Sequence, residues 1–170
     1  GEAFDKGARM LGLGFPGGPE IQKAAINGDA KKQKFTKPKM PGTFDFSFSG
    51  IKSALRREVE IESSKGQISS QKISDFAAGY QEVIVDSLVS KTIDAVKTHY
   101  ANGILIGGGV ASNQLLRKEI SDKSPVPVFI PRPDLCTDNG AMIAMTGWIK
   151  FKEKPSSQWD LDVIPGMKIG

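Results

Sequence analysis

The sequence contains a single cysteine, a single histidine and no apolar run long enough to cross a bilayer. With Cys136 alone, an internal disulfide framework and a cysteine-rich zinc site are both excluded. A membrane-spanning helix needs about 20 apolar residues, and apolar stretches such as residues 126–130 are far shorter. The first six residues lack the basic and apolar regions of a signal peptide. We therefore expect a cytoplasmic protein with no membrane partner.

The chain also lacks a starting methionine, and its first residues read as the middle of a motif. We expect it to be a portion of a longer protein, of a size that suits one domain or one lobe. Its formal net charge is +4. A solvated, lysine-rich surface explains this modest excess, and binding of tRNA is the alternative that the charge leaves open.

Hydrophobic periodicity predicts a mainly helical chain with a few short strands. Residues 70–99 carry an apolar stripe at helical spacing, typical of one long helix. We also predict helices at 2–13, 20–26, 51–62, 113–121 and 138–151, strands at 44–48, 103–106 and 126–130, and a lysine-rich loop at 29–42. The order of strand, helix, strand and helix near the end favours an α/β layer with a partly parallel sheet.

A glycine run that includes Gly108 and Gly109 lies between a predicted strand and a predicted helix. Glycines let the backbone approach a ligand, and a helix N-terminus offers free N–H groups. Asn113 can either cap that helix or contact a nucleotide with its amide. The run matches neither a Walker A loop nor GxGxxG. A tight strand-to-helix connection that binds no ligand would explain the glycine run equally well.

Three further residues have both a structural and a functional interpretation. Asp138 lies at a loop-to-helix junction, where Thr137 or Asp138 can cap the helix or Asp138 can bind a metal or act beside a phosphate. Asp5 has the spacing of a solvated helix face, and Gly18 belongs to a Pro-Gly-Gly-Pro turn that needs glycine for its backbone.

No nucleophilic catalyst is evident. His99, the only histidine, lies at the predicted end of the long helix, where a cation suits the helix dipole. Cys136 has no second histidine to activate it, and a buried thiol is the expected state. The catalytic residues are left unassigned.

Several motifs follow one another along the chain: Gly-Glu-Ala-Phe-Asp-Lys from Gly1, Phe-Pro-Gly-Gly-Pro from Phe15, Asp-Phe-Ser-Phe-Ser-Gly from Asp45, Gly-Gly-Val-Ala-Ser-Asn from Gly108 and Cys-Thr-Asp-Asn-Gly-Ala-Met-Ile-Ala from Cys136. Together they resemble the C-terminal portion of the bacterial TsaD/Gcp family, the tRNA threonylcarbamoyladenosine synthases once described as O-sialoglycoprotein endopeptidases. The resemblance covers residues 1 to about 151.

The resemblance implies an α/β actin-like ATPase (ASKHA) lobe with a mixed sheet and flanking helices. Residues 1–151 would form this part, with a helical insertion at about 51–100, and residues 152–170 a tail. The family transfers a threonylcarbamoyl group from threonylcarbamoyl-AMP to the adenosine beside the tRNA anticodon. Matched by motif, Asp5, Gly18, Gly108, Gly109 and Asn113 would bind the adenylate, or ATP or AMP. Asp138 would be the carboxylate ligand of one divalent metal, iron or possibly zinc.

The sequence departs from the family pattern in one respect. The two histidine metal ligands of the family lie in a His-x-x-x-His motif of the N-terminal half, which this chain does not contain. One carboxylate is a poor metal site, so we expect no turnover by this chain alone. The implied partners are tRNA, the missing N-terminal lobe and other threonylcarbamoylation proteins of the TsaB and TsaE types.

Other functions remain as alternatives. Another actin-like ATP-dependent kinase would use a similar glycine-rich motif, but not Asp-Phe-Ser-Phe-Ser-Gly. A metallo-endopeptidase would need a motif such as His-Glu-x-x-His, which is absent from this sequence. A non-catalytic, partner-binding lobe would need neither metal nor turnover.

Overall fold

The computed structural model describes residues 1–153 together with Asp162 and Gly166. In these residues the elements are α1 (Glu2–Met10), α2 (Gly17–Ala25), α3 (Ser49–Ser63), α4 (Ser70–His99), β1 (Ile104–Leu105), η1 (Gly109–Ser112), α5 (Gln114–Lys123), β2 (Val128–Phe129), η2 (Pro133–Leu135) and α6 (Gly140–Glu153). The fold is therefore mostly helical with a small parallel sheet.

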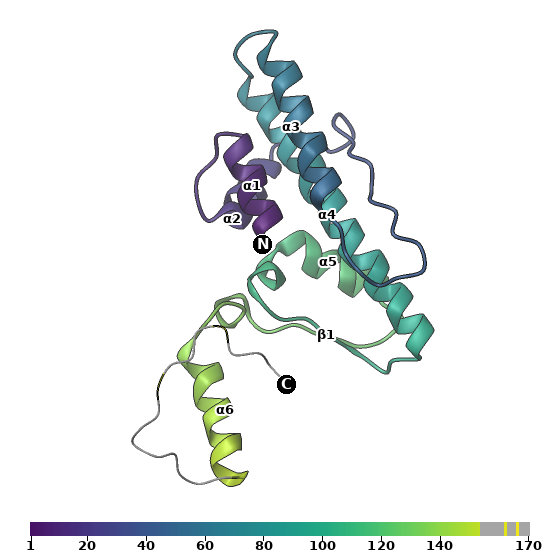
Figure 1. Ribbon diagram of the computed structural model, residues 1–170, viewed down its shortest axis with the longest axis vertical. Coiled ribbons are helices and arrows are strands. Elements are labelled where there is room, and N and C mark those ends of the chain that lie inside the picture. Colours follow the sequence, from purple (N-terminus) through teal and green to yellow (C-terminus); the bar gives the residue numbers. More distant parts are fainter. Residues whose placement is uncertain (154–161, 163–165, 167–170) are drawn as a thin grey trace.

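Helix α4 is the central element of the fold, and α1, α2, α3 and α5 pack against it (Figure 1). Its bounds agree with the long helix predicted from the apolar stripe, and its 30 residues extend about 45 Å at 1.5 Å per residue. The Ser69 hydroxyl accepts a hydrogen bond from the Lys72 N–H at 3.2 Å and caps its start. At its end Tyr100 adopts a left-handed conformation, with φ of 51°.

The first half of α4 packs against α1, α2 and α3. Phe4, Ile21, Leu55 and Phe76 are almost fully buried in this core. The Tyr80 hydroxyl donates a hydrogen bond of 2.8 Å to the carbonyl oxygen of Ala3. Burial raises the pKa of Tyr80, so the phenol stays protonated and continues to donate this bond.

The second half of α4 packs against α5 and the sheet. Ile104 pairs with Val128, and Leu105 with Phe129, in a parallel ladder. The chain crosses between the strands through α5, as parallel strands require. The expected mixed sheet is not formed by the described residues, which contain this two-stranded parallel sheet alone.

The predicted strand at residues 44–48 is wrong. This segment has no regular secondary structure and is paired with no strand of the described chain. Its aromatic residues make other contacts instead: the Phe46 and Phe48 rings stack with centroids 6.1 Å apart, and Phe48 packs against the core around α1. Alternation of apolar and polar residues predicts a strand only where a neighbouring strand supplies hydrogen bonds.

Two of the predicted helix boundaries shift by three residues. The first helix ends at Met10, three residues before the predicted end, and Gly12 follows with φ of 68°. The second helix begins at Gly17, three residues earlier than predicted. Pro19 is then its third residue, and a proline is tolerated in a first turn because that turn's N–H groups have no intrahelical acceptor.

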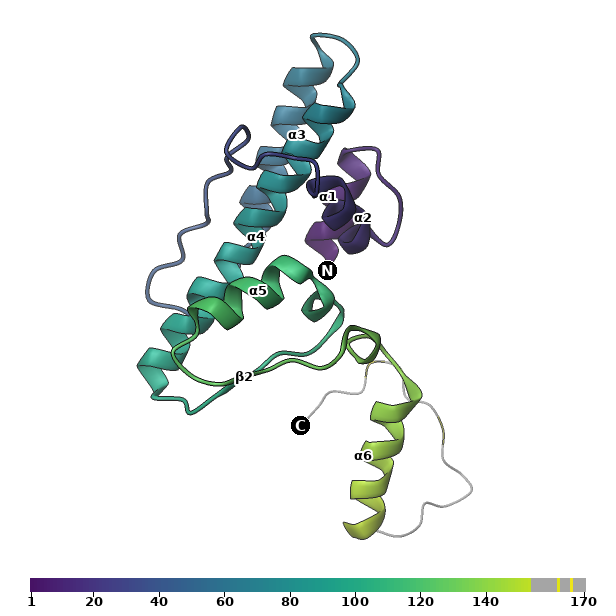
Figure 2. The ribbon, with the colours of Figure 1, turned by 180° about the vertical axis from the view of Figure 1, so that it is seen from behind.

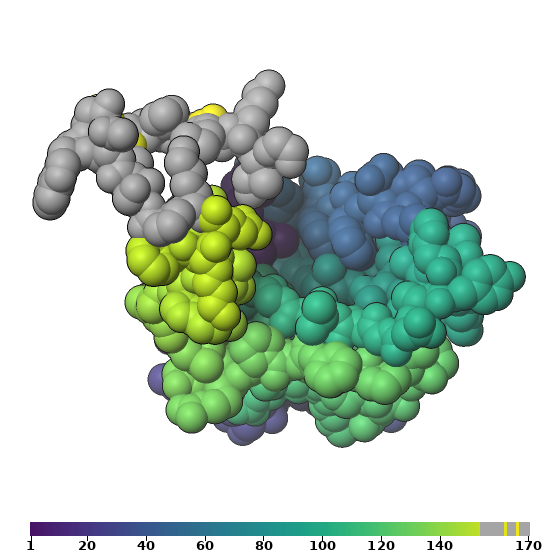
Figure 3. Space-filling view, turned by 90° about the horizontal axis from the view of Figure 1, so that it is seen from below, coloured from purple at the N-terminus to yellow at the C-terminus, as the bar shows by residue number. Residues whose placement is uncertain are grey.

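Helix α6 differs from the others because none of its residues is buried. The predicted core of strand, helix, strand and helix therefore forms from β1, α5 and β2 without α6. Figure 1 shows α6 standing apart from the other helices, and in Figure 3 its yellow-green atoms lie beside the green segment that precedes it. Of the predicted tail at 152–170, Lys152 and Glu153 belong to α6, and the rest lies outside the described residues except for Asp162 and Gly166. None of the described helices has the length and apolar composition that a membrane crossing requires.

Asp75 fastens the loop after α2 to α4. Its Oδ1 accepts hydrogen bonds from the Asp29 N–H at 2.9 Å and from Gln71 Nε2 at 3.0 Å. The bond from the Asp29 N–H, helped by Gln71 and nearby lysines, holds the pKa of Asp75 below its usual range despite burial.

This lowered pKa predicts a loss of stability in acid. A carboxylate whose pKa is lower in the folded state than in the unfolded state stabilises the fold above about pH 4. This contribution to the free energy of unfolding is lost as pH falls through the folded-state pKa. Between pH 7 and pH 3 the melting temperature should fall less in Asp75→Asn than in the unmodified chain. Asp94→Asn, an exposed position on the same helix, should behave as the unmodified chain. An unchanged pH dependence in Asp75→Asn would contradict this assignment.

Candidate functional site

A cavity of about 450 Å³ lies between α1, α2, η1 and the segment that leads into α6. Pockets of this size commonly take small ligands. Its walls come from four separate parts of the chain: Gly1, Phe4, Asp5, Pro16, Gly18, Pro19, Gln22, Gly109, Val110, Ser112, Asn113 and Thr137. The structure thus brings together Asp5, Gly18, Gly109 and Asn113. Gly108 and Asp138 each lie one residue from this wall.

The first wall is the junction of α1 and α2. The Gly17 N–H donates a hydrogen bond of 2.8 Å to Asp5 Oδ1. A Cβ on Gly17 would overlap the backbone of Phe4 and Asp5, so the two helices approach this closely only with glycine there. Asp5 is therefore more than a solvated acid, because its carboxylate holds the N-terminal turn of α2, where negative charge is favoured.

Gly18 lines the open side of the same junction. A Cβ built on it would meet no heavy atom within 4 Å. The space beside Gly18 therefore belongs to the cavity and not to protein packing. The close approach of Gly17 to α1 requires a glycine in Pro-Gly-Gly-Pro, whereas no packing contact requires one at Gly18.

The glycine run forms the opposite wall. Gly108 has φ of 85°, in the left-handed region, and leads into the short 3-10 helix η1. Asn113 then caps α5: its Oδ1 accepts from the Leu116 N–H at 3.0 Å, and its Nδ2 donates to Gln81 Oε1 at 2.8 Å. The capping interpretation of Asn113 is confirmed. Its side chain is 8% exposed and still lines the cavity. The 3-10 helix between strand and helix was not predicted.

Sequence reasoning missed Gln22, which joins the two walls. Its Oε1, on α2, accepts a hydrogen bond of 2.7 Å from the Gln114 N–H at the start of α5. No local pattern distinguishes Gln22 from an ordinary polar residue of a surface helix. Its role follows only from the distance between α2 and α5 in the folded chain.

Asp138 is exposed, and it does not cap α6. Asn139 does, since its Oδ1 accepts from the Met142 N–H at 3.0 Å. Among the described residues, no group of three histidine, cysteine, aspartate or glutamate side chains lies close enough together to hold a metal ion. The donors present therefore do not make a complete metal site.

Cys136 is buried, as expected from sequence. Its Sγ lies 3.4 Å from the carbonyl oxygen of Arg132 and 3.8 Å from an Arg117 nitrogen. His99 ends α4 and packs on Phe44 with ring centroids 5.2 Å apart. The described residues thus offer Cys136 no imidazole base, and its thiol holds the turn before α6.

The geometry defines a class of protein before any comparison: an α/β protein with a ligand-sized cavity between a glycine-rich strand-to-helix turn and the start of a second helix. The N-terminal ends of α2 and α5 border the cavity, and a helix N-terminus favours negative charge. Side chains already accept from several of the first N–H groups there: Gly17 bonds Asp5, Gln114 bonds Gln22 and Leu116 bonds Asn113. Asp5 and Asn113 add an acid and an amide.

The sequence pattern of the TsaD family, described as tRNA N6-adenosine threonylcarbamoyltransferase, matches residues 1–145, and the chain belongs to this family. A relative of that name from Dehalococcoides mccartyi is 46% identical over 169 residues, covering 99% of this chain and 50% of the relative. Relatives from Desulfitobacterium hafniense and Thermosipho africanus are each 44% identical over 173 residues and 99% of this chain, which covers 50% and 51% of their lengths. The chain thus spans about half the length of the curated relatives it matches.

Proposed function

We propose that this chain is the adenylate-binding part of a tRNA threonylcarbamoyltransferase. The observation that carries the proposal is the cavity that gathers Asp5, Gly18, Gly109 and Asn113 in a chain of the TsaD family. These side chains and glycines are distant in sequence, and packing alone does not explain the open space between them. We propose that this space holds threonylcarbamoyl-AMP or a related adenine nucleotide.

Each wall has a distinct role in this proposal. The backbone at Gly108 and Gly109 lets the ligand approach closely, and the positive end of the α2 dipole, beside Gly18, suits its negative charge. Asp5 and Asn113 have carboxylate and amide atoms suited to the ribose and the base. Because both side chains also hold the walls, binding and folding of this region are coupled.

The proposed reaction is acyl transfer. The exocyclic amine of the adenosine beside the anticodon attacks the carbamoyl carbon, the bond from that carbon to the phosphate oxygen breaks, AMP leaves and the amine loses a proton. The acyl group arrives already activated, so no serine or cysteine nucleophile is needed. A buried Cys136 without a base is consistent with this chemistry.

We further propose that Asp138 is one ligand of a divalent metal, iron or zinc, whose other ligands come from outside the described chain. We expect an actin-like lobe made from residues 1–151, with tRNA, TsaB- and TsaE-type proteins and the remaining half of the family's fold as partners. The exposed carboxylate of Asp138 lies next to Thr137, which lines the cavity.

The chain alone should therefore hold little metal. Elemental analysis after dialysis should find well under one equivalent of iron or zinc, since one carboxylate binds such ions weakly. Asp134→Ala, which removes another exposed carboxylate nearby, is the matched control for Asp138→Ala. A full equivalent that is lost in Asp138→Ala and kept in Asp134→Ala would contradict the prediction.

Calorimetry with AMP tests the adenylate site. Asn113→Ala should weaken AMP binding by roughly 1–3 kcal/mol, the range for losing a buried hydrogen-bonding partner. The same change removes the cap of α5, which costs about 1 kcal/mol of stability. Thermal unfolding is therefore measured in parallel, and the calorimetry is done at a temperature where both proteins are folded. Unchanged affinity for AMP, or no binding by the unmodified chain, would overturn the proposed site.

A further inference from the structure

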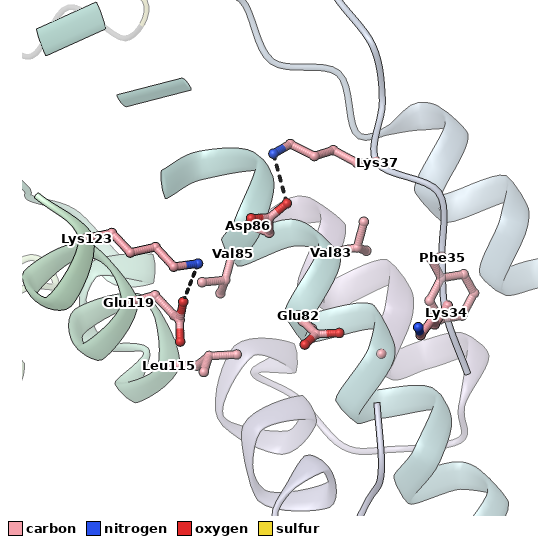
Figure 4. Close-up of a pocket in the computed structure, with 11 residues that line it drawn as sticks. Lys34, Phe35, Lys37, Glu82, Val83, Val85, Asp86, Leu115, Glu119 and Lys123 are labelled. Carbon is pink, nitrogen blue, oxygen red and sulfur yellow. Dashed lines mark ion pairs between the residues drawn. The ribbon is translucent and has the colours of Figure 1, made fainter. Parts of the chain in front are cut away.

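The loop between α2 and α3 carries concentrated positive charge. Residues 30–44 contain five lysines and no aspartate or glutamate. Lys37 is paired, with its Nζ 2.8 Å from Asp86 Oδ2 (Figure 4). The other four are exposed and form no ion pair with the described residues, and we call them the lysine face: Lys31, Lys32, Lys34 and Lys39.

The backbone beneath the lysine face is held in place at Gln33. This side chain is 8% exposed, and it accepts a hydrogen bond of 3.1 Å from Lys72 Nζ. Its carbonyl oxygen lies directly on α4 at Gly79, where a Cβ would overlap it. The lysines of the face therefore project from a fixed loop, which reduces the entropy lost when they bind a ligand.

The loop is also fastened at both ends. Near its start Asp29 is bonded to Asp75, and near its end the Met40 carbonyl accepts a hydrogen bond of 3.1 Å from Lys91 Nζ. These two anchors on α4 are 16 residues apart, which corresponds to about 24 Å along the helix at 1.5 Å per residue. One small phosphate ligand cannot contact a face of this length, whereas a polynucleotide backbone can.

Exposed aromatic rings lie at the far end of the loop. Phe44 is 42% exposed and packs on His99, and the next residue, Tyr100, is 89% exposed. Basic residues beside exposed aromatic rings are typical of surfaces that bind nucleic acid, because the rings can stack on unpaired bases.

The lysine face is separate from the candidate cavity. In both ribbon views the loop runs along one side of α4 while α1 and α2 lie on the other (Figures 1 and 2). The two sides are separated by a single helix, about 10–12 Å across with its side chains. A folded RNA can contact the loop on one side of α4 and still present a base on the other.

We propose that the lysine face binds the phosphate backbone of tRNA outside the reaction site. The inference rests on the proposed function, from which the RNA substrate follows, and on the names of the relatives, which state tRNA as their substrate. Lysine–phosphate contacts release counterions and contribute affinity without reading sequence. The face would therefore determine how strongly tRNA is held, while the cavity determines which chemistry follows.

The test compares two triple variants that each remove three positive charges. One is Lys31→Ala, Lys34→Ala and Lys39→Ala within the lysine face. The control removes three exposed basic residues of α3, its following turn and α5, through Arg56→Ala, Lys65→Ala and Lys118→Ala. The probe is an in vitro transcribed tRNA with an adenosine beside its anticodon, and fluorescence anisotropy measures its affinity between 50 and 200 mM salt.

The lysine-face variant should bind tRNA at least about tenfold more weakly, and its salt slope should fall by about 2 to 3, since each phosphate contact contributes roughly 0.7 to 0.9. The control variant should change affinity less than about twofold. An equal loss in both variants, an unchanged slope in the lysine-face variant, or no tRNA binding by the unmodified chain would overturn the inference.

Affinity for AMP separates this inference from the proposed function. The lysine-face variant should bind AMP as the unmodified chain does, because none of its three positions lines the cavity. If the lysine-face variant binds tRNA more weakly but the unmodified chain does not bind AMP, the RNA surface is supported and the adenylate site is refuted. If the lysine-face variant binds both AMP and tRNA as the unmodified chain does, only the RNA surface is refuted.

Discussion

Gly18→Leu should abolish most of the affinity of this chain for AMP while the fold stays intact. The side chain would enter open space, because a Cβ on Gly18 meets no heavy atom within 4 Å. That space is the cavity, so the leucine would occupy volume that the ligand needs. Overfilling a packed site costs about 1–3 kcal/mol, and every 1.4 kcal/mol is tenfold, so affinity should fall roughly 5- to 150-fold.

Gly50→Leu is the matched control for this experiment. Gly50 is also the second residue of a helix, and a Cβ there also meets open space, but it does not line the cavity. Leucine favours helix more than glycine does, so neither variant should lower the melting temperature. Calorimetry with AMP should find Gly50→Leu unchanged. If both variants bind AMP equally well, the cavity at Gly18 is not the nucleotide site.

The purified chain should self-associate through α6. Helix α6 carries six large apolar residues that are each 45–65% exposed: Met142, Ile143, Met145, Trp148, Ile149 and Phe151. Contiguous apolar surface of this kind is rare on monomeric proteins and marks interaction sites. In the proposed full enzyme the remaining half of the fold, or a protein partner, would cover it.

Light scattering coupled to size-exclusion chromatography measures this self-association. The unmodified chain should elute as a dimer or larger species, and Ile143→Glu with Trp148→Glu should elute mainly as a monomer, since glutamate keeps the helix and removes the apolar contact. The control is the double variant Ile26→Glu and Ile61→Glu, which removes two exposed apolar residues outside α6. It should elute with the same molar mass as the unmodified chain. A strictly monomeric unmodified chain that also transfers threonylcarbamoyl to tRNA would contradict both this prediction and the expected absence of turnover.

Local periodicity was sufficient for α4 but not for residues 44–48. A helix satisfies its backbone hydrogen bonds within its own segment, so the apolar stripe that predicts residues 70–99 needs no knowledge of the rest of the chain. A strand needs a partner, and in the described chain none lies beside residues 44–48. The aromatic residues that produced the strand pattern instead pack at the edge of the core, as Phe48 does.

In the candidate site, too, local features could be predicted from sequence and long-range contacts could not. Its residue types, the glycine run before α5 and the capping position of Asn113 are evident from sequence, because turns and caps are local. Sequence alone determined the long helix, the glycine-rich turn and the family resemblance, and it gave the cap as one of two roles for Asn113. Only the tertiary structure decided that Asp5 holds Gly17, that Gln22 joins α2 to α5, and that Gly18 and Gly109 line one cavity. These depend on contacts between distant segments, and such contacts form only when the helices pack.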